Sequence, residues 1–155
     1  MASPLPTPRK VSPELLQALH RIKSLRHYPI GATLYRQGSA GAGVYLVLTG
    51  EVRVLLQSGP REEQLLQVMG PGTMLGLSES MTGANHRTRA EAGDKTTVGF
   101  IPRQEFRGFL LEHADYCMQV VASLSDELHG IYHKFRSITA HPGRPRHRLL
   151  EEQLN

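Results

Sequence analysis

The sequence predicts a mainly β domain, an antiparallel sandwich or barrel, with helices on either side of it. Short apolar runs separated by glycines fill the middle of the chain, and turn residues recur about every 8–12 positions, as in such folds. Apolar residues at helical spacing mark both ends of this region. The 155 residues, 39% hydrophobic and 21% charged, are enough for one core and one globular domain.

The N-terminal part predicts a tail followed by a helix. Residues 1–11 contain three prolines and few apolar side chains, so we expect a flexible tail there. Ser12 has the character of a helix N-cap, and Pro13 suits the first helical position. Apolar residues then recur at helical spacing as far as Leu25, and we expect the helix to end just before Pro29.

The middle of the chain, from Ile30 to Ile101, contains most of the 15 glycines and is expected to form the sheets. Five segments between the glycines predict strands, namely residues 44–48, 52–56, 65–69, 89–92 and 97–101. Ser58, Gly59 and Pro60 predict a hairpin turn between the second and third of these strands.

The C-terminal part predicts a short helix from Pro102 and then a long one over residues 113–138. Its apolar residues alternate in spacings of three and four, which is the pattern of a coiled-coil seam. They are Ala114, Cys117, Val121, Leu124, Leu128, Ile131, Phe135 and Ile138. We expect a homodimer through residues 114–138 with Cys117 and the residues after it in the interface. Packing of the helix on its own barrel is the alternative. Residues 139–155 are expected to form a basic tail.

Composition excludes several classes of protein. The single cysteine, Cys117, rules out an internal disulfide, an iron–sulfur cluster and a multi-cysteine zinc site within one chain. No stretch approaches the ~18 consecutive apolar residues of a membrane span, and the N-terminus lacks the apolar segment of a secretory signal. We therefore expect a cytoplasmic protein with no membrane partner. The net charge of +4 lies partly in the tails and is weak evidence for a nucleic-acid groove.

Four segments in this order resemble the effector domain of the Crp/Fnr family of transcriptional regulators. They are residues 34–38, 43–52, 71–76 and 100–106, which are similar to the family's paired-strand signature, its glycine turn and its exit strand and helix. The resemblance covers roughly residues 15–138. It implies a double-stranded β-helix, the jelly roll of cyclic-nucleotide-binding domains, over residues 12–112, followed by a dimerisation helix over 113–138.

The resemblance also implies a ligand site just after the glycine turn. Its residues are Gly76, Leu77, Ser78 and Glu79, with His86, Arg87 and Thr88 across from them. Backbone amides at such a helix start can bind an anion. Leu77 stands where cyclic-nucleotide binders carry a glutamate for the ribose, and His86 or Arg87 takes the place of their phosphate-binding arginine. A cyclic nucleotide is therefore one candidate ligand and an unrelated effector is another, and no metal is expected.

Three hypotheses for function follow. The first is a dimeric, non-catalytic effector domain whose small-molecule ligand shifts the long helix. It would reach DNA only through a domain absent from this chain, because a winged helix-turn-helix needs ~70 residues and seventeen follow Ile138. The second is a ligand-free dimerisation scaffold with a degenerate pocket, which Leu77 favours. The third, a cupin-like metalloenzyme, needs a histidine cluster, and only His86 lies between Ile30 and Ile101.

The lining of the pocket distinguishes the first two hypotheses. Arg87 or Arg89 pointing inward beside the amides of residues 76–79 would favour an anionic ligand. An apolar or collapsed pocket would favour a scaffold.

Overall fold

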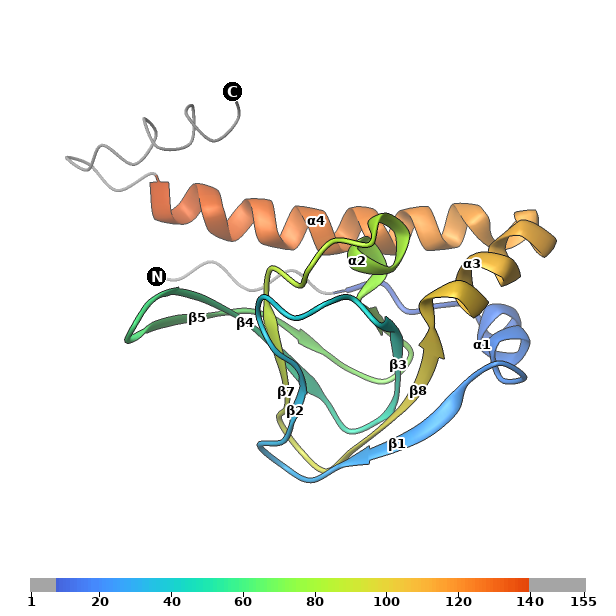
Figure 1. The fold of residues 1–155 in the computed structure, drawn as a ribbon, viewed down its shortest axis with the longest axis horizontal. Coiled ribbons are helices and arrows are strands. Elements are labelled where there is room, and N and C mark those ends of the chain that lie inside the picture. Colours follow the sequence, from blue (N-terminus) through green and yellow to red (C-terminus); the bar gives the residue numbers. More distant parts are fainter. Residues whose placement is uncertain (1–7, 140–155) are drawn as a thin grey trace.

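Two four-stranded antiparallel sheets form the body of the domain, in the orders β1-β8-β3-β6 and β2-β7-β4-β5 (Figure 1). The structure is a computed structural model that describes residues 8–139, with side chains described as far as His129. This double-sheet arrangement is a jelly roll. The predicted fold class, a jelly roll with flanking helices and a long C-terminal helix, is confirmed.

The predicted strands and helices occur in the expected order, together with three strands and one helix that were not predicted. The strands are β1 (Ser24–Tyr28), β2 (Thr33–Tyr35), β3 (Gly43–Thr49), β4 (Val52–Gly59), β5 (Glu62–Met69), β6 (Met74–Leu75), β7 (Arg89–Ala92) and β8 (Thr96–Pro102). The helices are α1 (Pro13–Leu19), α2 (Leu77–Thr82), α3 (Arg103–Glu112) and α4 (Cys117–Thr139), with a 3-10 turn at Ala114–Tyr116 before α4. All five predicted strands are present, and the predicted turn joins β4 to β5.

The first helix begins where it was predicted and ends earlier. The Ser12 hydroxyl accepts the N–H of Leu15 at 3.2 Å, and Pro13 opens the helix. The helix ends at Leu19, so the prediction of a helix through Leu25 is wrong. Strand β1 pairs with β8 along its whole length, and Leu25 is 58% exposed. The hydrogen bonds of this ladder override the helical spacing of the apolar residues.

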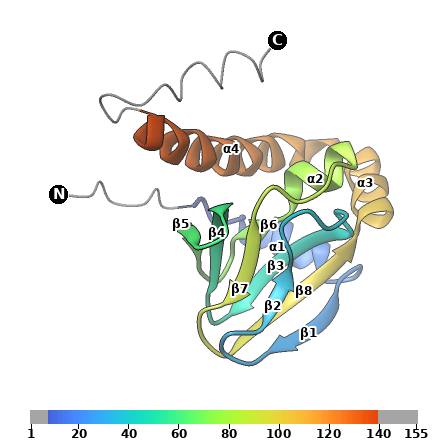
Figure 2. The same ribbon diagram turned by 60° about the vertical axis from the view of Figure 1, so that its left-hand side comes forward.

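Strand β3 separates two apolar clusters. Because side chains alternate along a strand, Tyr45 and Val47 point between the two sheets, whereas Val44 and Leu46 point toward the helices. The second cluster joins β3 and β8 to α1, α3 and the first half of α4. This packing fixes the helices on the outer face of the first sheet (Figure 2).

The last part of the expected N-terminal tail is packed against α4. The N–H of Val11 donates to the carbonyl oxygen of Gly72 at 2.8 Å. Arg9 Nε lies 3.1 Å from Asp126 Oδ2, and the N–H of Ser12 donates to Gln119 at 3.2 Å. Residues 1–7 and 140–155, where the rest of the tail and the basic tail were expected, lie outside the described residues.

The predicted seam of α4 is divided between two faces of the helix. Cys117 and Leu124 pack against the helix-covered cluster beside the buried Val120. Val121 and Leu128 point away from the barrel and are 53% and 45% exposed. The helix therefore packs on its own barrel and also presents apolar residues outward. The side chains of Ile131, Phe135 and Ile138 lie outside the described part of the chain.

We predict that Leu46→Ala lowers the free energy of unfolding by about 3 kcal/mol, because it leaves a cavity in the helix-covered cluster. Leu46 is fully buried, whereas Leu111 is 87% exposed. The matched control Leu111→Ala should change stability by less than about 0.5 kcal/mol. Urea denaturation of both variants tests this, and equal losses would contradict the assignment of the core.

Candidate functional site

The site is built around the tight turn into helix α2. Gly76 precedes the helix with φ +79°, and a Cβ there would lie 2.7 Å from the carbonyl oxygen of Gly43 on β3. Both the left-handed backbone and the close approach require glycine at this position. The turn thus holds the first residues of α2 tightly against β3.

The first three amides of α2 have no partner within the helix, because the first intrahelical bond runs from the N–H of Ser80 to Gly76. The carboxyl group of Glu127, on α4, lies near the amides of Leu77 and Ser78, which act to lower its pKa. The backbone of Glu79 acts in the same direction on the pKa of its own side chain. Two acidic side chains of this chain therefore lie beside the start of α2.

A small cavity lies beside this turn, between the two sheets and beneath α4. Its lining residues are Tyr35, Val54, Gln67, Met69, Met74, Leu75, Gly76, Thr88 and Glu127. The free volume is about 10 Å³, which is room for about one water molecule. Helix α4 lies over this end of the sheets in Figure 1 and Figure 2 and contributes Glu127 to the lining. The free volume is far too small for a nucleotide, so the walls of the cavity must move before one can enter.

Burial and its neighbours set the charge state of Glu127. Burial raises the pKa of this carboxyl group to about 8, and the nearby Glu79 carboxylate raises it as well, although the amides of Leu77 and Ser78 counteract both effects. One carboxyl oxygen, Oε2, is fully buried and has no hydrogen-bond partner among the described residues. Burial of the Glu127 carboxyl group in the cavity therefore costs free energy.

His86 and Glu79 form a buried pair at the edge of the cavity. Their side chains are 3% and 6% exposed, and Nδ1 of His86 lies 3.6 Å from Oε1 of Glu79. The imidazole ring stacks on Tyr35 with 3.8 Å between ring centroids. Burial raises the pKa of Glu79, but His86 and the amides of Glu79 and Arg87 outweigh it and leave this pKa lowered. Glu79 therefore remains an anion beside His86.

Tyr35 and Thr88 add neutral polar groups to the cavity wall. Burial raises the pKa of the Tyr35 phenol, and the negative charge of Glu127 raises it further, so the phenol stays protonated. A hydrogen bond with Thr88 acts in the opposite direction. Together with Gln67, which is 3% exposed, these groups could orient a polar ligand.

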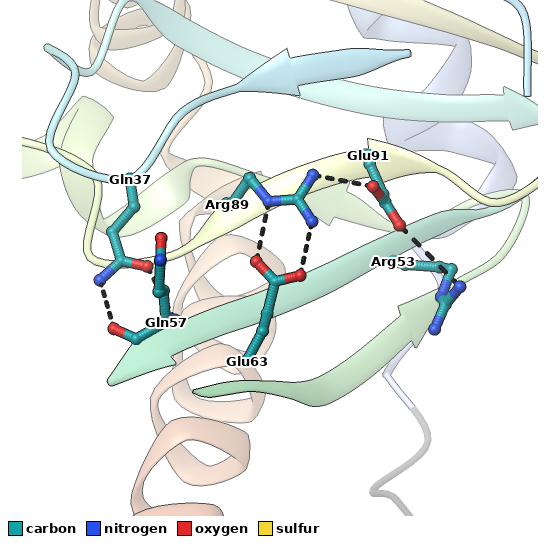
Figure 3. A network of polar contacts seen from close by, with 6 residues as sticks. All are labelled: Gln37, Arg53, Gln57, Glu63, Arg89 and Glu91. Carbon is teal, nitrogen blue, oxygen red and sulfur yellow. Dashed lines mark hydrogen bonds and ion pairs between the residues drawn. The ribbon is translucent and has the colours of Figure 1, made fainter. Parts of the chain in front are cut away.

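The two candidate arginines lie outside the cavity. Arg87 is exposed to solvent. Arg89 donates through Nε and Nη2 to Glu63 at 3.0 and 2.7 Å, and through Nη1 to Glu91 at 2.8 Å (Figure 3). Glu91 also lies 3.9 Å from Arg53. Arg89 therefore belongs to a surface network of ion pairs across β4, β5 and β7, together with Arg53, Glu63 and Glu91.

The structure brings together part of the predicted site. Gly76, the amide of Ser78, Glu79, His86 and Thr88 gather at or beside the cavity. The Leu77 side chain points away into the helix-covered cluster.

Sequence reasoning missed Glu127, Tyr35 and Gln67. Glu127 could have been found, because it lies three residues after Leu124 on the helix face that carries Val120. An acid at an inward position of an apolar face indicates a polar contact beneath it.

Residues 8–139 contain neither a metal-binding cluster nor a membrane-spanning helix. No group of three or more histidine, cysteine, aspartate or glutamate side chains is placed there to hold a metal ion. No helix in this range is long and apolar enough to cross a membrane.

Comparisons with known proteins agree with this fold. The cyclic nucleotide-binding domain family matches residues 25–113. The chain is 27% identical to patatin-like phospholipase domain-containing protein 6 of Pongo abelii, over 64% of this chain and 7% of that protein. It is 22% identical to the CRP-like cAMP-activated global transcriptional regulator of Mycobacterium tuberculosis, over 91% of this chain and 64% of the regulator.

The structure superposes on the catabolite activator protein of Thermus thermophilus with a TM-score of 0.72. The two sequences are 22% identical, and the match covers 83% of this chain and 61% of the other. At this level of identity the likeness shows a shared fold. The chain thus spans a small part of the phospholipase and just under two thirds of the regulator. On the match over residues 25–113, the chain belongs to the cyclic nucleotide-binding domain family.

Proposed function

We propose that this chain is the effector domain of a dimeric, non-catalytic regulator of the Crp/Fnr type. The observation that carries the proposal is the position of α4, which closes the cavity with one face and presents apolar residues on another. A ligand that enters the cavity must move this helix, and the movement would change the contacts of the outer face. The output, including any contact with DNA, lies in another domain.

The exposed apolar residues of α4 support pairing with a second copy of the chain. Met118, Val121 and Leu128 are 74%, 53% and 45% exposed. Val121 and Leu128 are seven residues apart in the heptad stripe, so they lie on one side of the helix. Pairing of two such helices would bury them.

The nature of the ligand follows from the amides of α2 and the neutral groups of the cavity. The amides at the start of α2, which act to lower the pKa of the nearby Glu127, suit an anionic oxygen group of a ligand. Tyr35, Gln67 and Thr88 suit the polar part of a small molecule. A small anionic effector, with a cyclic nucleotide as the first candidate, fits both features.

A ligand-free dimerisation scaffold is the second candidate function. The closed cavity and the outward position of Arg87 favour it. Under both candidates α4 pairs with a second copy, and they differ in whether the cavity ever opens.

The double variant Val121→Glu, Leu128→Glu should be a monomer at micromolar concentration, because four carboxylates would be brought together in the paired helices. Both residues are exposed on the single chain, so the fold should persist. Multi-angle light scattering measures the mass, and circular dichroism checks the fold. Leu111→Glu, at a residue 87% exposed on α3, is the matched control and should remain a dimer. An unchanged dimer in the double variant would refute pairing through this stripe.

Titration calorimetry with cyclic AMP and cyclic GMP separates the two candidate functions. The effector hypothesis predicts heat from one or both nucleotides at millimolar concentration, and weaker binding by His86→Ala, which removes the partner of Glu79 and the ring stacked on Tyr35. Exposed Arg87→Ala is the control and should bind as the wild type does. Absence of heat from both nucleotides would favour the scaffold.

A further inference from the structure

We propose that residues 8–12 form a clasp on α4: they fasten the first half of this helix to the turn between β5 and β6, and the helix becomes looser on the barrel when the clasp opens. The clasp needs neither a ligand nor a second copy of the chain, so the inference goes beyond the proposed function. It assigns a role to the described end of a segment that the sequence predicts only as a tail.

The two ends of the clasp contact α4. Oδ2 of Asp126 accepts two hydrogen bonds from Arg9, one from the backbone N–H at 3.3 Å and one from Nε at 3.1 Å. The backbone N–H of Ser12 donates to Oε1 of Gln119 at 3.2 Å. Gln119 and Asp126 are about two turns of helix apart. The clasp therefore holds α4 at two separate points.

The middle of the clasp contacts the barrel. The N–H of Val11 donates to the carbonyl oxygen of Gly72 at 2.8 Å, and the N–H of Gly72 donates to the carbonyl oxygen of Val47 on β3 at the same distance. The Lys10 side chain lies over Gly72, where an added Cβ would be 3.4 Å from Cβ of the lysine. The clasp is thus attached to a turn that is itself fixed to the first sheet.

The clasp uses a side of α4 that is separate from its two other faces. Gln119 and Asp126 are seven residues apart, so they lie on one side of the helix. Val120 packs on the helix-covered cluster on another side, and Val121 and Leu128 face outward on a third. The helix is therefore held from two directions, by apolar packing on the barrel and by the polar contacts of the clasp.

The exposure of these contacts allows the clasp to open without unfolding of the barrel. The side chains of Arg9 and Asp126 are 64% and 27% exposed, and ion pairs this exposed are weak and sensitive to salt. A groove with a free volume of about 250 Å³ lies beside them, and Met118 and Ala122 of α4 contribute to its lining. Apolar packing between clasp and helix is thus incomplete, and local opening should be frequent.

Amide hydrogen exchange tests the clasp with a charge reversal and its rescue. Arg9→Glu places two carboxylates together, so the Val11 and Ser12 amides should exchange about fivefold faster, while the amides of β8 keep their protection. Adding Asp126→Lys restores an ion pair and should restore slow exchange. Arg107→Glu, at an exposed residue of α3, makes the same charge change and should alter neither amide. Unchanged exchange in Arg9→Glu, or no recovery in the double variant, would overturn the proposal.

Sodium chloride provides a test with opposite signs in the two proteins. Raising its concentration from about 0.05 M to about 1 M screens exposed charges. In the wild type this should speed exchange of the Val11 and Ser12 amides, because attraction between Arg9 and Asp126 keeps the clasp closed. In Arg9→Glu it should slow exchange, because repulsion keeps the clasp open. Changes of the same sign in both proteins would refute an electrostatic fastening.

The reactivity of Cys117 tests whether the clasp holds α4 itself. Cys117 is the single cysteine of the chain, and it packs half-buried on the helix-covered cluster at the start of α4. Its alkylation by iodoacetamide should be about threefold faster in Arg9→Glu, return to the wild-type rate when Asp126→Lys is added, and stay unchanged in Arg107→Glu. If the Val11 and Ser12 amides exchange faster while Cys117 reacts at the wild-type rate, the segment opens without loosening the helix, and the proposal is overturned.

Discussion

The first turn of α2 imposes the constraint on which the site depends. Three consecutive amides there have no partner within the helix, and they lie beneath α4, where buried amides need acceptors. Two acidic side chains lie beside them, Glu79 from the same helix and Glu127 from the distant α4. The packing of Val120 and Leu124 on the helix-covered cluster holds α4 over this turn. The remaining strands hold α2 in place for this contact.

Glycine and strand alternation explain how the sheets achieve that placement. Gly76 can pass close to the Gly43 carbonyl because neither carries a side chain, and the turn stays fixed on β3. The alternation along β3 then sends Tyr45 into the jelly roll and Leu46 toward the helices. One strand therefore supports both the cavity wall and the platform on which α4 packs.

Local rules were enough to predict much of this fold from the sequence. The Ser12 cap, the β4–β5 turn and the five strands each depend on neighbours in the chain. The end of α1 was mispredicted because Leu25 is held in β1 by pairing with β8, more than seventy residues away. The candidate site divides in the same way: Gly76 and Glu79 belong to a local motif, whereas Glu127 lies beside them only through the packing of α4. Residue spacing places Glu127 on the inward face of α4, but its position beside α2 follows only from tertiary packing.

The two faces of α4 link pairing to occupancy of the cavity. Glu127 and Leu124 face the barrel, while Val121 and Leu128 face outward on the same turns of helix. A rigid helix cannot move away from the cavity without turning or shifting its outer residues. In the proposed dimer, any ligand that moves α4 therefore changes the free energy of pairing, and pairing must change the affinity for that ligand by the same factor. The proposed dimer would thus convert occupancy of the cavity into a signal between subunits.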